Sequence, residues 1–322
     1  MIFEDFRLAR IQSNLVMPED FAGYDLLERA CLEGLKNEEK ADENFSKLEY
    51  NKMLEMLEDF FKRQDSYFYD IYRKVITSKN VTIYDANKIN PQSLKYMNKK
   101  DENGFKMYGE AMLIRKSGKY RMILPVHGDV NDLYTFVHEI AHMFDANLID
   151  NAGLNILSEV TPFAFEKRLS EYLIEKGYND DAQRYTDSRK EYIHDRSSQL
   201  LNQVMLVNTI ERSEFLTADA VKEYILGNSR LCNQLNINES NYAKYYKDNI
   251  SGMTSVRVHD ITAYAPYVIA QYVVNKSHAL DNDRSLRIHA STLGKVDQYR
   301  SFELIGEECY DELEDKAVGY SR

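Results

Sequence analysis

Thr135-Phe136-Val137-His138-Glu139-Ile140-Ala141-His142-Met143-Phe144-Asp145 is the most informative stretch of this chain. It places the pattern His-Glu-x-x-His inside an apolar sequence with helical spacing. Two histidines four residues apart lie on the same face of a helix, one turn above the other. His138 and His142 can therefore bind one tetrahedral zinc ion. Glu139 can take a proton from a zinc-bound water, so the stretch predicts a zinc hydrolase.

A chance origin is the alternative interpretation, because this pattern also occurs in helices with solvated histidines. The neighbouring residues favour a buried helix instead. Burying a His or Glu side chain without a partner costs about 1–3 kcal/mol or more. A metal ion supplies such a partner, which favours the metal site. The apolar neighbours are Leu133, Phe136, Val137, Ile140, Ala141 and Phe144.

The composition is that of a folded protein rather than a nucleic-acid binder. The chain has 322 residues, and its 5 prolines and 13 glycines disfavour a turn-rich all-β fold. The net charge of −11 argues against a nucleic-acid partner, because a polyanion would be repelled on average. The 3 cysteines are far apart in the sequence, which argues against a disulfide framework and fits a reducing compartment.

The sequence shows no signal for export or membrane insertion. The N-terminus lacks a basic region followed by an apolar run. No stretch reaches the roughly 18 apolar residues of a membrane span. We therefore expect a cytoplasmic protein that acts outside the membrane, with export by a signal-less route left open. The oligomeric state is not evident from the sequence.

Helical periodicity extends over most of the chain and predicts a mainly α fold. A helix is expected from about residue 18 to 35, and one long helix over 48–75. After residue 131 the sequence predicts almost only helix, beginning with the His138 helix, for which Asn131 or Asp132 is the expected cap. Further helices are expected at about 155–177, 180–215, 217–226, 238–248 and 259–275.

The predicted β structure is confined to one small element beside the His138 helix. Residues 81–84 predict a short strand. Residues 110–115 and 120–125 predict a hairpin with Ser117-Gly118 as its turn. Pro125 predicts that the second hairpin strand ends there or lies at a sheet edge.

No linker rich in Pro, Gly or Ser divides the sequence, so we expect residues 1–322 to form a single α-rich metallopeptidase domain. Its expected parts are N-terminal helices (1–78), a small β element (79–130), a helical core with the zinc site (131–275) and a C-terminal helical segment (276–322).

A third protein ligand is needed for zinc, with one position left open for water. Glu159 is the best candidate, because it follows His142 by 17 residues. That interval allows the first helix to end, the chain to turn at Gly153 and a second helix to return a carboxylate to the metal. The alternative for Glu159 is a solvated charge.

Two further acidic residues share faces with the predicted ligands. Glu166 follows Glu159 by seven residues, two turns along the same helix face, and Asp145 follows His138 by the same interval. Either carboxylate could accept a hydrogen bond from the free ring nitrogen of a ligand histidine, an interaction that zinc sites usually contain. A solvated charge is about equally compatible with each.

Three blocks of the sequence resemble the zinc oligopeptidases of the oligopeptidase F and thimet oligopeptidase group. The first block is 134–142, similar to the zinc helix of that group. The second is 158–166, similar to a Glu-Val-Ala-Ser block with a second glutamate seven residues on. The third is 258–272, similar to a C-terminal histidine followed by a tyrosine-rich helix. The resemblance covers roughly residues 105–275.

The resemblance implies a zincin-like α-helical core with one zinc ion. It implies His138, His142 and Glu159 as ligands and Glu139 as the general base. It also implies that the segment around His259 lines the cleft and stabilises the oxyanion, with Tyr264 and Tyr267 as the candidate tyrosines. The implied activity is hydrolysis of peptide bonds in oligopeptides.

Two other functions stay open. One is a specialised protease that cleaves a particular protein, which the chain's shortness relative to that group suggests. The other is a non-catalytic binding module that keeps the zinc fold. Retention of His138, Glu139, His142 and Glu159 together argues against the second.

Overall fold

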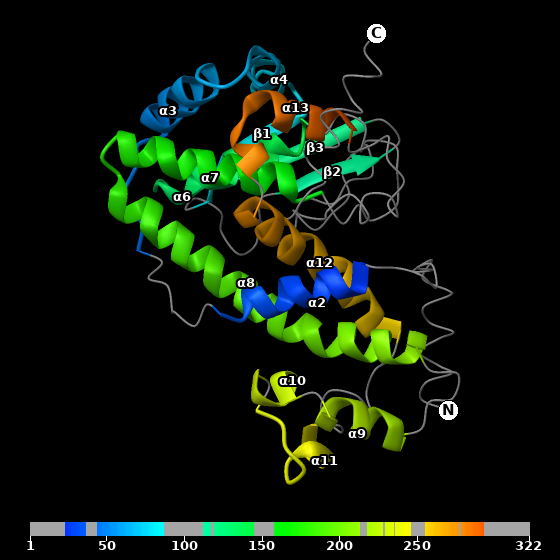
Figure 1. Ribbon diagram of the computed structural model, residues 1–322. Coiled ribbons are helices and arrows are strands. Elements are labelled where there is room, and N and C mark those ends of the chain that lie inside the picture. Colours follow the sequence, from blue (N-terminus) through cyan, green and yellow to red (C-terminus); the bar gives the residue numbers. More distant parts are fainter. Residues whose placement is uncertain are drawn as a thin grey trace, which may run out of the picture. The chain divides into compact units, whose positions relative to one another are not determined.

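The chain is mainly helical, as its sequence predicts (Figure 1). The computed structural model describes residues 23–36, 44–86, 112–116, 119–144, 158–212, 218–227, 229–234, 236–245, 255–276 and 278–292. Its helices are α2 (Gly23–Gly34), α3 (Tyr50–Lys62), α4 (Ser66–Ile76), α6 (Asn131–Ala141), α7 (Val160–Glu175), α8 (Asn179–Arg212), α9 (Ala218–Gly227), α10 (Ser229–Gln234), α11 (Tyr242–Tyr245), α12 (Ser255–Lys276), η3 (His278–Asp281) and α13 (Asp283–Thr292).

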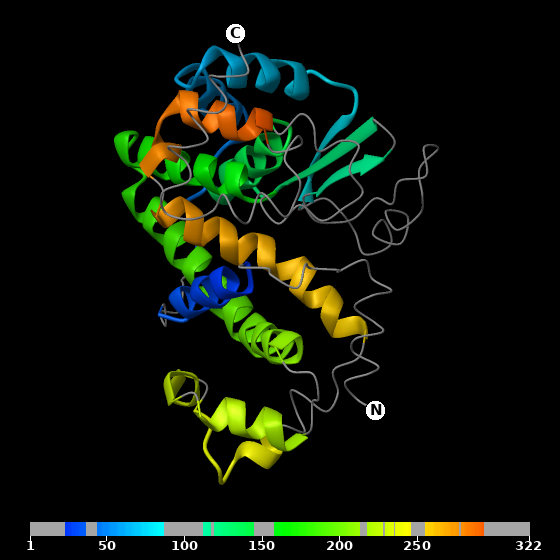
Figure 2. The ribbon, with the colours of Figure 1, turned by 45° about the vertical axis from the view of Figure 1, so that its right-hand side comes forward.

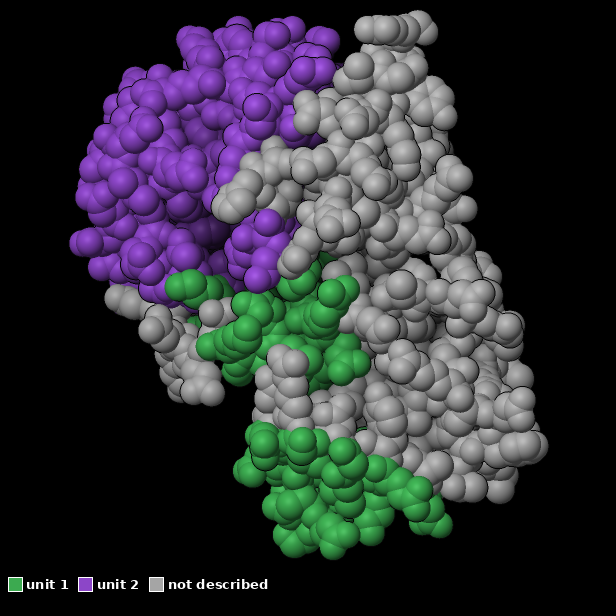
Figure 3. Space-filling view, in the orientation of Figure 1, with its two compact units in different colours: residues 1–39, 190–272 green, residues 40–189, 273–322 purple. Residues whose placement is uncertain are grey.

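The chain divides into two compact units, coloured separately in Figure 3. Unit 1 comprises residues 1–39 and 190–272, and unit 2 comprises residues 40–189 and 273–322. Helix α8 contributes residues to both. The expected single domain over residues 1–322 stays a prediction. Among the described residues, no helix has the length and apolar character needed to cross a membrane.

A small mixed sheet in unit 2 contains the predicted hairpin (Figure 2). Strands β2 (Met112–Lys116) and β3 (Lys119–Val126) pair antiparallel, which confirms the hairpin. Strand β1 (Val81–Asp85) pairs parallel with β3, so the strand order is β1-β3-β2. Helix α6 packs against β3, which places the sheet beside the His138 helix.

Pro125 does not have either of its predicted positions. Strand β3 continues to Val126 and is the central strand of the sheet, with a partner on each side. Among the described residues, β2 pairs with β3 only as far as Ile123. On the β1 side, Pro125 lies opposite Tyr84.

The predicted long helix over 48–75 is instead two helices, α3 and α4. The Asp65 side chain accepts a hydrogen bond from the Tyr67 backbone N–H at 2.8 Å, which caps the start of α4. The apolar periodicity continues across the break because both helices bury their apolar faces in one core. Periodicity alone therefore could not locate the interruption.

An aromatic cluster packs α4 against the two segments that carry the predicted ligands. The Phe68 ring lies 4.9 Å from that of Phe144 and 5.0 Å from that of Phe165, between ring centroids. Phe144 and Phe165 lie 4.8 Å apart. Phe144 follows His142 by two residues, and Phe165 directly precedes Glu166. This buried cluster therefore holds the two segments that carry the predicted ligands against α4.

The start of α6 is held by Asp132, although not as a helix cap. Val130 is the N-cap residue and its side chain makes no cap hydrogen bond, so the predicted cap at Asn131 or Asp132 is wrong; the Asp129 side chain instead accepts from the Asn131 N–H at 3.1 Å. Asp132 lies within the first turn, and its buried carboxylate accepts the backbone N–H groups of His127, Gly128 and Asp129 at 2.8–3.3 Å. The carboxylate bonds the loop from β3 rather than the helix, and so fixes where α6 begins.

Candidate metal centre

Helix α6 places both histidines of the motif on one face. His138 lies in the last turn of the helix, and His142 is its C-cap residue. His142 keeps helical backbone angles (φ −58°, ψ −23°), and its N–H lies 3.3 Å from the His138 carbonyl oxygen. The imidazole centroids are therefore 4.9 Å apart, as the i, i+4 spacing requires.

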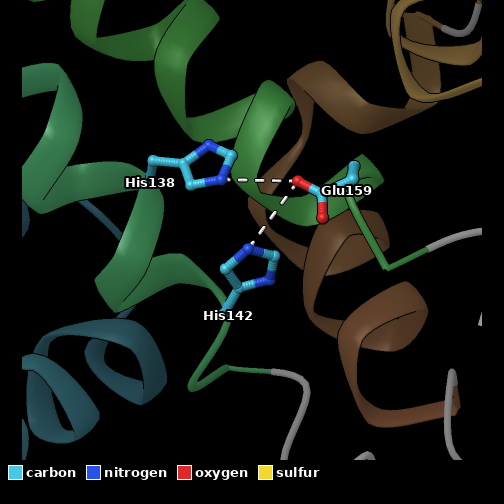
Figure 4. A group of neighbouring side chains, drawn as sticks. All are labelled: His138, His142 and Glu159. Carbon is cyan, nitrogen blue, oxygen red and sulfur yellow. Dashed lines mark ion pairs between the residues drawn. The ribbon is translucent and has the colours of Figure 1, made fainter. Parts of the chain in front are cut away.

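The Glu159 carboxylate, at the start of α7, lies beside both imidazoles (Figure 4). It is the N-cap residue of α7, the helix that packs against α6. Its Oε2 lies 3.3 Å from His138 Nε2 and 3.7 Å from His142 Nε2. The structure thus brings together His138, His142 and Glu159, the three residues predicted to bind the metal.

The three side chains could together hold one metal ion. Their ligand atoms all lie within 4.8 Å of one another. Two atoms bound to one tetrahedral zinc at its usual bond lengths are about 3.3 Å apart, close to the observed 3.3 and 3.7 Å. Glu159 Oε2 is buried, and within the described residues it has no partner in hydrogen-bond geometry. A cation would satisfy that oxygen.

Charges in the metal-free site compensate one another. Burial favours neutral His138, but the carboxylates of Glu159 and Glu166 outweigh burial and raise its pKa to about 10. Burial would raise the pKa of Glu159, but His142 and His138 lower it to about 2. The carboxylates of Glu159 and Glu166 therefore favour a positive charge between them, which is the electrostatic requirement for binding a cation.

Glu166 is the carboxylate behind His138. Its Oε1 accepts a hydrogen bond from His138 Nδ1 at 2.7 Å, and only 4% of its side chain is exposed. The sequence predicts this interaction from the two-turn spacing to Glu159. Asp145, the other predicted acceptor, lies outside the described residues.

Two residues of α8, Tyr185 and Arg189, complete this network, and no motif in the sequence predicts their part in it. Arg189 Nη2 donates to Glu166 Oε1, and it also donates to the Tyr185 hydroxyl at 2.5 Å. Burial by itself would raise the pKa of Glu166, but the Arg189 guanidinium and His138 together outweigh burial and lower that pKa. Tyr185 and Arg189 have the spacing Tyr-x-x-x-Arg, which puts both on one face of α8. Such a pair has no specific signature in a single sequence.

The structure describes the side chains of some predicted catalytic residues and not of others. Glu139 follows His138 in α6 and is partly exposed. Tyr264 and Tyr267 lie in α12 within unit 1, where the guanidinium of Arg196 lies 4.2 Å over the Tyr264 ring. The side chain of His259 lies outside the described residues. The oxyanion roles of His259, Tyr264 and Tyr267 stay predictions.

Zinc binding should depend on pH because it displaces a proton from His138. With a pKa of about 10, His138 is protonated in the metal-free protein at neutral pH. A higher pH removes the competing proton, so the apparent zinc affinity should rise by about tenfold per pH unit between pH 6 and 8. Titration calorimetry in two buffers of different ionisation enthalpy should detect at least one proton released per zinc. An affinity that stays constant over this range would contradict the assignment of His138.

No known protein family, curated protein or solved structure matches this chain. Assignment of a function therefore depends on the chemistry of the residues themselves. The resemblance to the oligopeptidase group rests on three short blocks and stays a prediction.

Proposed function

We propose that this chain is a zinc-dependent metalloendopeptidase that hydrolyses peptide bonds in oligopeptides, related to the oligopeptidase F and thimet oligopeptidase group. The convergence of His138, His142 and Glu159 on one point carries the proposal. Three protein ligands of this kind leave one coordination position open, which distinguishes catalytic zinc sites from structural ones. Glu139, the next residue after a ligand, supports hydrolysis as the reaction.

Each residue of the site has a defined task in this proposal. His138, His142 and Glu159 would hold the ion. When bound, zinc lowers the pKa of a coordinated water towards about 7 and polarises the scissile carbonyl. Glu139 takes the proton from the attacking water and delivers it to the amine that leaves. Glu166 accepts a hydrogen bond from His138 Nδ1, which leaves Nε2 free to bind the ion.

The substrate is proposed to be an extended peptide. Strand β2 lies at one edge of the sheet, with β3 as its partner among the described residues. A strand at the edge of a sheet can bind extended peptide backbone by adding it as a further strand. His259, Tyr264 and Tyr267 are proposed to stabilise the oxyanion, as the resemblance implies.

A peptide-cleavage profile tests the proposal. Protein loaded with one equivalent of zinc is incubated with a library of fluorogenic oligopeptides. We expect cleavage of many sequences, loss of cleavage after chelation and its recovery on adding zinc. A zinc-loaded protein that cleaves none of them would contradict the oligopeptidase assignment and favour a protease with one protein target. A protein that binds no zinc would favour the non-catalytic binding module.

A further inference from the structure

Glu166 is a buried carboxylate whose position depends on more than its contact with His138. The side chain has three rotatable bonds, so one hydrogen bond alone would not fix its orientation. Its Oε1 also accepts from Arg189, whose guanidinium in turn donates to the Tyr185 hydroxyl. These partners come from α8, whereas Glu166 belongs to α7 and His138 to α6.

Arg189 is itself held in place by aromatic side chains. Its guanidinium lies 4.4 Å over the ring of Phe163, which precedes Glu166 by one helical turn on α7. Its Nη2 donates to the Tyr185 hydroxyl at 2.5 Å. The ring of Tyr185 stacks on that of Tyr134 of α6, with centroids 3.4 Å apart and planes 6° apart. The cation is therefore anchored to both helices that carry the metal ligands.

We propose that Arg189, supported by Tyr185, is a positioning residue of the metal centre: it holds the Glu166 carboxylate against His138 Nδ1 and thereby keeps His138 Nε2 directed at the ion. This inference rests on the proposed zinc centre and is independent of which substrate is cleaved. The hydrogen bond to Nδ1 fixes the tautomer of His138 that leaves Nε2 with its lone pair for the metal.

The direction in which zinc affinity changes when Arg189 is removed distinguishes positioning from the other roles that Arg189 could have. A cation that acts only through its charge would repel the zinc ion, so its removal would strengthen zinc binding. A cation that only joins α7 to α8 would change the stability of the fold and leave the zinc affinity as it is. Loss of positioning alone weakens zinc binding, and it does so only while Glu166 is present.

A double-mutant cycle between Arg189 and Glu166 tests the proposal. Zinc affinity is measured by competition with a chelator for the wild type, Arg189→Met, Glu166→Gln and the double variant. We expect Arg189→Met to weaken zinc binding by about 10- to 100-fold, as loss of an outer partner of a metal ligand does. In the Glu166→Gln background the same substitution should change the affinity by less than about threefold, because the group that Arg189 holds is already altered.

Arg168→Met is the matched control. Arg168 is also a largely buried arginine of unit 2 and pairs with a carboxylate, that of Asp283. Its other hydrogen bonds go to the Leu280 carbonyl at 3.1 Å, the Asp281 carbonyl at 3.0 Å and the Gln64 side chain at 2.9 Å, none of which belongs to the metal centre. Arg168→Met should lower the thermal stability of the metal-free protein and leave the zinc affinity unchanged.

Two milder variants keep the test decisive if Arg189→Met does not fold. Tyr185→Phe keeps the ring stacked on Tyr134 and removes only the hydroxyl, and we expect zinc binding to weaken by about three- to tenfold. Arg189→Lys keeps the charge without the planar fork of donors, and its zinc affinity should fall between those of wild type and Arg189→Met.

Zinc affinity equal to or above the wild-type value in the folded Arg189 variants would overturn the inference, as would effects of Arg189→Met and Glu166→Gln that simply add. If the cycle shows the expected coupling and the zinc-loaded protein cleaves no peptide, the positioning role stands and the peptidase proposal is wrong. If peptides are cleaved and the coupling is absent, only the positioning role is wrong.

Discussion

Glu139→Gln should leave zinc bound and remove hydrolysis. We expect one equivalent of zinc at wild-type affinity and a decrease in kcat/KM of about 10²- to 10⁴-fold, the usual contribution of a general base. This decrease corresponds to about 3–5 kcal/mol of lost transition-state stabilisation. The side chain of Gln has nearly the same shape as that of Glu, so the effect isolates the proton-accepting carboxylate.

The measurement combines zinc analysis with initial rates on a cleaved peptide. Glu171→Gln is the matched control, because Glu171 is exposed on α7 and the substitution makes the same change in charge. The control should retain both zinc and activity. Normal cleavage by Glu139→Gln would show that another group accepts the proton, and loss of zinc in this variant would show that Glu139 contributes to metal binding.

His142→Ala should lose both the metal and the reaction. His142 Nε2 is one of the three atoms that converge on the site, and no other described His, Cys, Asp or Glu joins this group. Removing one of three ligands should weaken zinc binding by roughly a thousandfold, on the order of a third of the binding free energy of a protein-bound zinc. Cleavage should be absent at zinc concentrations that saturate the wild type.

Thermal unfolding in the presence of zinc provides a readout that needs no substrate. A ligand that binds only the folded state raises its stability in proportion to the logarithm of its concentration. The wild-type melting temperature should therefore rise with free zinc, and that of His142→Ala should not. His127→Ala is the control, because the His127 side chain is 54% exposed and contacts Asp132 rather than the site. A zinc-dependent rise that persists in His142→Ala would contradict the role of His142.

The metal centre was largely predictable because it depends on two helical spacings. His138 and His142 are separated by one turn, and Glu159 and Glu166 by two turns, so their relative directions follow from helix geometry. The long-range step was the return of α7 to α6. It was predicted from the 17-residue interval between His142 and Glu159 and from the need for a third ligand. The observed Glu159 to His138 distance of 3.3 Å agrees with that expectation.

The parts that were not predicted depend on interactions without a local pattern. Arg189 of α8 donates to Glu166 of α7 and to the Tyr185 hydroxyl, and nothing in the sequence around Arg189 indicates either partner. Asn131 or Asp132 is the predicted cap of α6, but the Asp132 carboxylate bonds the loop before the helix. Asp65 interrupts a continuous apolar stripe with a cap that periodicity does not detect.

The catalytic residues beyond Glu139 were predicted from resemblance alone. Tyr264 and Tyr267 lie in α12, where Tyr267 packs edge-on against Tyr192 with centroids 5.6 Å apart. Helical spacing within α12 predicts which tyrosines share a face, but it does not predict which of them faces a metal bound by other helices. Their tasks therefore stay predictions, together with those of His259 and Asp145.

A crystal of the protein grown with one equivalent of zinc, measured at the zinc absorption edge, tests the metal centre most directly. We predict a single anomalous peak bonded to His138 Nε2, His142 Nε2 and a carboxylate oxygen of Glu159, each at about 2.0–2.2 Å. A peak elsewhere in the molecule, or one at the two imidazoles with the Glu159 carboxylate beyond bonding distance, would contradict it.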